Sequence, residues 1–244
     1  MRNYQSSLAL GGMAIALSVL GTAHAGIANT KHNLSTSHIG SSRFYTDTTE
    51  ICLFCHTPHM TVAKSDNIPL WNHQISSTVS TYGTYTSGSF NGAGTIHDVG
   101  GATSPANATV TNLCLSCHDG TTAVNALYNA SNLSGNVNPS VAGNTPADGK
   151  LGATWASNLG TDLTNDHPVN FTYDNALFAA DGDLHDPQDT AGTGLGGPKL
   201  YNGTVQCASC HDPHIDYSGA NSAQTPFLRV AITGSTLCLK CHNK

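Results

Sequence analysis

All eight cysteines of this 244-residue chain lie in four copies of one five-residue pattern, a Cys-x-x-Cys pair followed directly by histidine. The copies are Cys52-Leu-Phe-Cys55-His56, Cys114-Leu-Ser-Cys117-His118, Cys207-Ala-Ser-Cys210-His211 and Cys238-Leu-Lys-Cys241-His242. No cysteine is left over for a disulfide, a lipid anchor or a nucleophile. The four copies, numbered here as motifs 1 to 4, therefore determine what every thiol in the chain does.

This spacing is typical of covalent attachment of c-type haem, in which two thiols form thioether bonds and the adjacent histidine becomes the proximal iron ligand. We therefore predict four haem c groups. The predicted thioether residues are Cys52, Cys55, Cys114, Cys117, Cys207, Cys210, Cys238 and Cys241, and the proximal ligands are His56, His118, His211 and His242. Zinc sites and redox dithiols also use Cys-x-x-Cys pairs. Neither needs a histidine directly after the second cysteine, and all four pairs have one.

Residues 1–25 predict a secretion signal. Arg2 supplies the positive charge, residues 8–20 form an apolar run, and Ala23-His24-Ala25 is a cleavage site, so the mature chain is expected to begin at Gly26. The apolar run is too short to span a bilayer comfortably, and no later segment is apolar enough to do so. We expect an exported protein without membrane insertion, located outside the cell or at its surface, with the periplasm as the alternative.

Composition predicts a mostly irregular fold with short helices. The whole chain has only 2 Trp, 6 Phe and 8 Tyr, so four haems must supply much of the core. The segments between motifs are rich in Gly, Ser, Thr, Asn and Pro and read as loops, with short helices at each motif and at residues 170–180. No segment shows the sustained alternation of apolar and polar residues that would predict a β-sheet. We expect a multihaem cytochrome c fold in one domain, residues 26–244.

The net charge argues against two kinds of binding partner. Loss of Arg2 leaves eight basic residues against 15 acidic ones, a net charge of −7. This balance argues against binding of nucleic acid or an anionic membrane surface.

The motifs form a weak internal duplication. Motifs 1 and 3 continue to a Pro-His dipeptide, in the sequences CHTPH and CHDPH, and motifs 2 and 4 share the pattern LCLxCH. The repeating unit is therefore a pair of haems, at residues 52–118 and 207–242.

Histidine is the expected second axial ligand of each iron. The methionines are Met1, Met13 and Met60, of which only Met60 survives removal of the signal. Eight histidines lie outside the motifs and the signal, namely His32, His38, His59, His73, His97, His167, His185 and His214. Bis-histidine ligation is therefore possible at all four irons, and it implies lower reduction potentials than methionine ligation.

The strongest distal candidates are His59 and His214, each three residues after a motif histidine. Three residues span about 10 Å at most, which is too short to reach the other face of the same porphyrin. Each is therefore expected to bind a neighbouring haem; the alternative is a surface histidine after a turn. His167 follows Asp166, which can orient its ring.

His32 is the fourth distal candidate, with His38 as its close competitor. His73 is in reserve, either as a ligand or as a contact to a haem propionate beside Trp71. His97 and His185 lie in Gly- and Asp-rich loops and are expected to be solvated.

The motif segments resemble a family of exported multihaem cytochromes, and most of all the tetrahaem OmcE-type cytochromes of metal-reducing bacteria. The segments are residues 51–59, 69–73, 113–121, 162–169, 206–214 and 237–242. The resemblance implies bis-histidine haems, little regular structure, and polymerisation into extracellular filaments. It also implies that His59, His167 and His214 are ligands within the chain, and that His32 or His38 binds a haem of the next subunit.

These features predict electron transfer to other redox proteins or an external acceptor, and no enzymatic activity. The alternatives are a soluble periplasmic shuttle and a haem reductase for a small anion such as nitrite. A reductase needs an open iron position, and the Cys-x-x-Cys-Lys motif of nitrite-reducing cytochromes is absent.

Overall fold

The computed structural model describes residues 26–38, 44–57, 70–76, 78–92, 108–130, 137–142, 146–188 and 195–243. The predicted secretion signal, His59, Met60 and His97 lie outside these residues. Within them, no helix is long and apolar enough to cross a membrane.

Most of the described chain is irregular, with short helices and two-residue strands between bends and turns. The α-helices are α1 (Val110–His118), α2 (Asn175–Asp181) and α3 (Cys207–Cys210). The 3-10 helices are η1 (Gly26–Asn29), η2 (Cys52–Phe54), η5 (Gly219–Gln224), η6 (Thr233–Ser235) and η7 (Cys238–Lys240). The strands are β1 (Tyr45–Thr46), β2 (Gly83–Thr84), β3 (Val141–Ala142), β4 (Asp162–Leu163), β5 (Phe171–Thr172) and β6 (Thr204–Val205).

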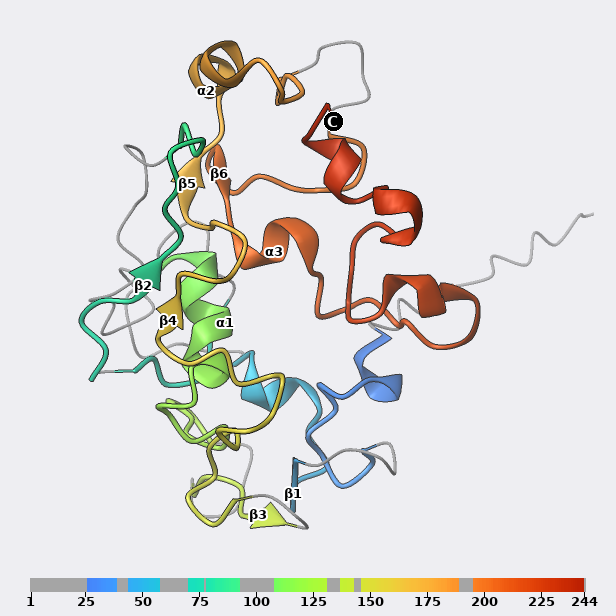
Figure 1. The fold of residues 1–244 in the computed structure, drawn as a ribbon. Coiled ribbons are helices and arrows are strands. Elements are labelled where there is room, and N and C mark those ends of the chain that lie inside the picture. The colour runs from blue at the N-terminus through green and yellow to red at the C-terminus, as the bar shows by residue number, and fades with distance from the viewer. Residues whose placement is uncertain are drawn as a thin grey trace, which may run out of the picture.

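The strands pair only two at a time. β1 pairs with β3 and β5 with β6 in antiparallel register, whereas β2 and β4 are parallel. In Figure 1, β1 and β3 lie at one end of the molecule and α2 at the other, with α1 and α3 between them. The sheets therefore fasten loops to one another and do not form a layer.

Helix α2 begins later than the sequence predicts. Asn170 adopts a positive φ of 63°, and the next two residues form β5. The helix then starts after Asp174, whose side chain accepts a hydrogen bond from the Leu177 amide. It ends at Gly182, whose φ of 71° is the left-handed conformation that glycine adopts readily.

Within the part of the chain that the structure describes, buried apolar residues form four small clusters and no single core. Two of them contain motif residues, since Leu53 and Phe54 pack with Leu127, and Leu115 packs with Leu163. The largest lies under β5 and β6 and includes Phe171.

Helices α1 and α3, which carry motifs 2 and 3, are joined through Gln206. Its side-chain oxygen accepts hydrogen bonds from the amide and hydroxyl of Thr111, at 3.0 and 2.6 Å. Its amide group donates to Asn170 and Thr204, both at 2.7 Å. Gln206 is 3% exposed, and its two bonds to Thr111 are buried and hold the two motif helices together.

The N-terminal segment, residues 26–38, folds onto its own chain. The Gly26 amide donates to the His214 carbonyl at 2.9 Å, and Asn29 donates to Asp216 at 2.8 Å. Thr30 and Asn33 are fully buried. The sequence suggested a segment free to reach a neighbouring subunit, and these contacts correct that expectation for residues 26–33.

Candidate haem sites

All four motifs have the same local backbone, a single helical turn. Motif 2 ends α1, and in the other three motifs the amide of the histidine donates to the carbonyl of the first cysteine. These distances are 2.9 Å at His56, 3.1 Å at His211 and 3.0 Å at His242. A helical turn places residues three and four apart on one face, so each motif directs its two thiols and its imidazole to the same side.

The backbone of each motif histidine is hydrogen-bonded to, or paired with, a segment from elsewhere in the chain. His56 pairs with Trp71, His211 with Leu228 and His242 with Leu184 in isolated β-bridges, and the His118 carbonyl accepts from the Leu159 amide at 2.7 Å. One turn of helix is not stable alone. These backbone contacts therefore help to hold each motif histidine in place.

The thiols of successive motifs lie close enough to influence one another. The thiols of Cys114 and Cys207 share a hydrogen bond, which links motif 2 to motif 3. The charge of Cys55 raises the pKa of Cys117, and the charge of Cys238 raises that of Cys210, in each case after the larger effect of burial. The four motifs therefore follow one another in space in the order 1, 2, 3, 4.

Most of these thiols are neutral at pH 7. Burial, and then the charge of Cys52, raise the pKa of Cys55 to about 12, while burial and the charges of Cys210 and Cys238 raise the pKa of Cys241 to about 11. The pKa of Cys207 is the exception, because its hydrogen bond with Cys114 outweighs burial and lowers it.

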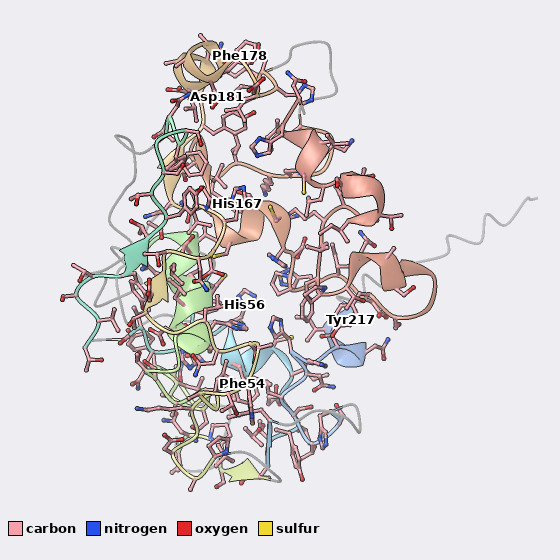
Figure 2. The ribbon with its side chains drawn as sticks, viewed as in Figure 1. Phe54, His56, His167, Phe178, Asp181 and Tyr217 are labelled. Carbon is pink, nitrogen blue, oxygen red and sulfur yellow. The ribbon has the colours of Figure 1, made fainter. Side chains whose placement is uncertain are left out.

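Three motif histidines each have a second imidazole packed near them. The ring centroids of His56 and His214 are 6.1 Å apart, those of His118 and His32 are 6.1 Å apart, and those of His242 and His167 are 6.5 Å apart. Each second imidazole belongs to one of the four distal candidates. Figure 2 shows His56 near the middle of the molecule and His167 farther toward α2.

These separations fit one iron between each pair. A metal–imidazole nitrogen bond is about 2 Å and the nitrogen lies about 1.1 Å from the ring centre, so two rings on opposite faces of one iron are about 6.2 Å apart. The interplanar angles are 17°, 64° and 73°, so the pairs share a separation while their ring orientations differ. In direct contact, aromatic rings also reach such distances edge to face.

Among the described residues, no group of three or more His, Cys, Asp or Glu side chains is arranged to hold a metal ion. A structural zinc site needs four such ligands, whereas a haem iron takes four from the porphyrin and two from the protein.

In the first pair, His214, three residues after motif 3, faces His56 of motif 1. Its Nδ1 lies 3.0 Å from a carboxylate oxygen of Asp212. Because a carboxylate only accepts, Nδ1 carries the proton and Nε2 keeps its lone pair for a metal. Burial raises the pKa of Asp212, but hydrogen bonds from His214 and the charge of Arg229 outweigh it, so the pKa lies below its usual value.

In the second pair, His32 faces His118. Nδ1 of His118 donates to the Ser157 carbonyl at 2.6 Å, which leaves its Nε2 available, and the His32 ring stacks on Phe227 at 4.3 Å. Burial, followed by the charge of His118, lowers the pKa of His32 to about 3, so its imidazole is neutral. His32 therefore lies close to a motif of its own chain, and the intersubunit role that the resemblance implies for His32 or His38 stays a prediction.

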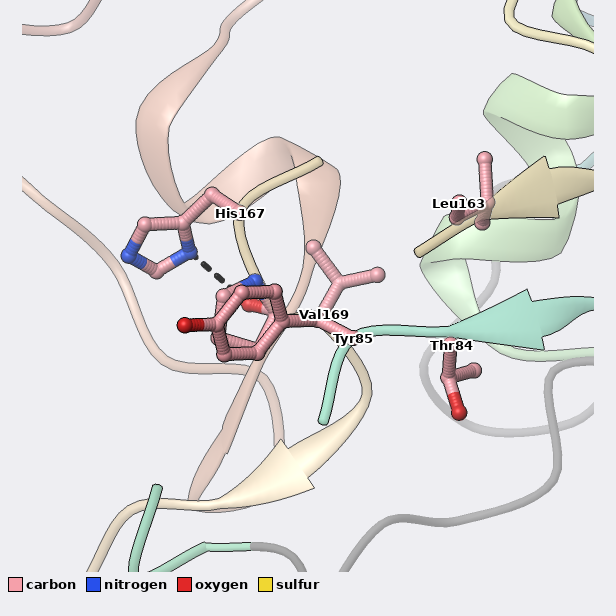
Figure 3. Close-up of a pocket in the computed structure, with 6 residues that line it drawn as sticks. Thr84, Tyr85, Leu163, His167 and Val169 are labelled. Carbon is pink, nitrogen blue, oxygen red and sulfur yellow. Dashed lines mark hydrogen bonds between the residues drawn. The ribbon is translucent and has the colours of Figure 1, made fainter. Parts of the chain in front are cut away.

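In the third pair, His167 faces His242 of motif 4. The sequence suggested that Asp166 orients its ring, but Nδ1 of His167 donates instead to the Pro168 carbonyl at 2.9 Å. Figure 3 shows this bond at the edge of a small pocket lined also by Tyr85, Leu163 and Val169. The apolar lining is the kind of surface that a porphyrin edge can cover.

Motif 3 has no facing imidazole among the described residues. Nδ1 of His211 donates to the Pro226 carbonyl at 2.9 Å, so its Nε2 is available in the same way as in the other motifs. His59, the remaining strong distal candidate, lies outside the described residues.

The other histidines have different surroundings. His73 is fully buried, with Nδ1 3.1 Å from the Ser116 hydroxyl and Nε2 3.0 Å from the Ala123 carbonyl. Both ring nitrogens of His73 are therefore engaged, and its reserve role as a ligand stays a prediction. The half-buried His38 stacks on Tyr45 at 3.8 Å, and His185 is exposed.

Two supporting features were missed from the sequence. Arg229 reaches Asp212 from 17 positions away, with nothing in its local sequence to mark it. The indole nitrogen of Trp71 is buried and has no hydrogen-bond partner in the described part of the chain. A buried donor needs an acceptor, and a haem propionate beside His56 would provide one.

No protein-family model matches this chain, and no curated protein is significantly similar to it.

Proposed function

We propose that this chain is an exported electron-transfer protein that carries four covalent haem c groups, one on each motif, and that it is not an enzyme. The observation that carries the proposal is the 6.1–6.5 Å separation between three motif histidines and three histidines from elsewhere in the chain. This is the spacing of bis-histidine iron ligation.

Each residue then has a defined role. The eight motif cysteines hold the porphyrins, and the motif histidines bind the irons on one face. His214, His32 and His167 bind the opposite faces at motifs 1, 2 and 4, and His59 is assigned to motif 3 by its equivalence to His214. Hydrogen bonds from Nδ1 to Asp212, Ser157, Pro168 and Pro226 fix ring orientation.

The order of the motifs provides a path for electrons. When bound, haem supplies one-electron oxidation and reduction at iron. The thiol contacts bring each motif close to the next, and the contact between Cys114 and Cys207 joins the two halves of the duplication. The chain's own contribution is to hold four redox centres in series and to occupy both faces of the irons.

The proposal is tested on the purified, exported protein. Intact mass is expected to show four haem additions on a chain that begins at Gly26, and the reduced protein is expected not to bind carbon monoxide. Two or three haems would contradict the four-site assignment. Rapid carbon monoxide binding would instead favour the reductase alternative, because it requires an open iron position.

One substitution tests the pairing directly. His214→Ala is expected to convert one of the four haems from low-spin to high-spin, measured by absorption and electron paramagnetic resonance, while its covalent attachment is kept. His185→Ala is the matched control, since His185 is also an exposed histidine but faces no motif histidine in the structure. Four low-spin haems in His214→Ala would refute the assignment.

A further inference from the structure

The acceptor of the His214 ring differs from those of the three other candidate axial histidines, proximal or distal, whose Nδ1 acceptor the structure shows. Nδ1 of His214 is bound by the carboxylate of Asp212 at 3.0 Å. Nδ1 of His118, His211 and His167 is bound in each case by a backbone carbonyl. A side-chain carboxylate carries a full negative charge, whereas a backbone carbonyl carries only a partial one.

Asp212 is itself held in place. Its second oxygen accepts from Arg229 at 3.0 Å, and the same guanidinium donates to the Ala208 carbonyl at 2.8 Å and to the Tyr201 hydroxyl at 3.1 Å. The Asp212 and Arg229 side chains are 23% and 18% exposed. The carboxylate is therefore anchored to the backbone of motif 3, while the histidine that it orients faces motif 1.

An anionic acceptor changes the imidazole that it binds. It draws the Nδ1 proton toward itself and leaves more electron density at Nε2, which makes Nε2 a stronger donor to a metal. A stronger axial donor stabilises the oxidised iron more than the reduced iron, and so lowers the reduction potential. Arg229 moderates this effect because it shares the carboxylate.

We propose that Asp212 is a positioning residue that acts through His214 and holds the reduction potential of the first site below the value it would have with a neutral acceptor. The inference rests on the proposed function, since it requires a haem iron between His56 and His214.

The test is Asp212→Asn in the full-length protein with all four haems attached. Asparagine keeps the shape and an oxygen that can accept from His214, but it removes the negative charge and the second oxygen, which accepts from Arg229. One of the four midpoint potentials in a spectroelectrochemical titration is expected to move upward while three stay in place, and one low-spin electron paramagnetic resonance signal is expected to shift with it. Asp212→Glu, which restores the carboxylate, is expected to return most of that shift.

Asp216→Asn is the matched control. It removes the same charge two residues beyond His214, from a carboxylate that accepts from Asn29 and from the Ser218 amide. All four potentials are expected to stay in place. Unchanged potentials in Asp212→Asn, or an equal shift in Asp216→Asn, would overturn the inference. Failure of the proposed function looks different, because the wild-type protein would then lack covalent low-spin haem altogether.

Discussion

At the scale of single residues, the number of hydrogen-bond partners separates two kinds of histidine. His214 and His167 each have one ring nitrogen engaged and the other left over, so each can bind a metal. Both ring nitrogens of His73 are engaged, and its side chain has no exposed surface. It therefore joins the Ser116 side chain in α1 to the backbone of Ala123. Residue type alone does not distinguish these roles.

His73 is expected to make the protein sensitive to acid. Burial lowers its pKa to about 4, so the folded state keeps it neutral while the unfolded state protonates near pH 6.5. This contribution is complete above pH 6.5 and is lost as the pH falls toward 4. Between pH 7 and pH 5 the wild type is expected to lose about 2 kcal/mol more unfolding free energy than His73→Gln, measured with urea. Equal losses would show that His73 is not neutral and buried.

The sequence predicts which residues can carry the chemistry but not how they pair. The motif spacing is local, so the cysteines and proximal histidines can be assigned from it directly. The contact between His56 and His214 depends on the path of the whole chain between them, and that path runs through loops without periodic signals. The position of His32 could not be predicted in the same way. Its segment is held by small polar contacts, such as the hydrogen bonds that Asn33 donates to the carbonyls of Ala28 and Ser37.

At the scale of elements, short helices persist because other segments hold them. Helix α1 begins with reciprocal hydrogen bonds between Thr109 and Asn112, which the structure shows as a capping box. Helix α3 is a single turn, and it depends on the bonds that Gln206 makes to Thr111 of α1. The helices at the motifs were predictable, whereas two-residue strands leave no periodic signal in a sequence.

Gln206→Ala is expected to lower the unfolding free energy by about 2–3 kcal/mol, because it leaves the buried Thr111 amide without an acceptor. Urea denaturation measures the loss. Gln188→Ala is the control, since Gln188 is exposed, and its effect is expected to stay within about 0.5 kcal/mol. Similar effects of the two substitutions would show that the link between α1 and α3 contributes little.

At the scale of the whole molecule, the N-terminal segment limits how copies can join. Residues 26–33 are fastened to the chain's own C-terminal half, and His32 already faces His118. His38 is the remaining histidine of this segment. Its Nδ1 lies 3.2 Å from the Ser35 carbonyl, so its Nε2 is available for a contact with a second copy. A contact of this head-to-tail kind can continue without closing, as a filament.

If the protein forms the filaments that its resemblance to OmcE-type cytochromes implies, His38→Ala is expected to abolish them and leave monomers with four haems. Negative-stain electron microscopy of the secreted fraction detects the filaments, and mass measurement confirms the haem content. His185→Ala is expected to keep them. Filaments that persist in His38→Ala would show that this histidine does not couple the subunits.

The pairing of distant histidines also has a consequence for the order in which the protein can be completed. A chain made from its N-terminus has both histidines of the second pair once His118 has emerged, since His32 precedes it. The first motif must wait for His214, and the fourth motif has His167 ready before His242 is made. A chain that stops between residues 118 and 210 therefore contains one finished pair, His32 with His118, and an earlier motif still without its partner.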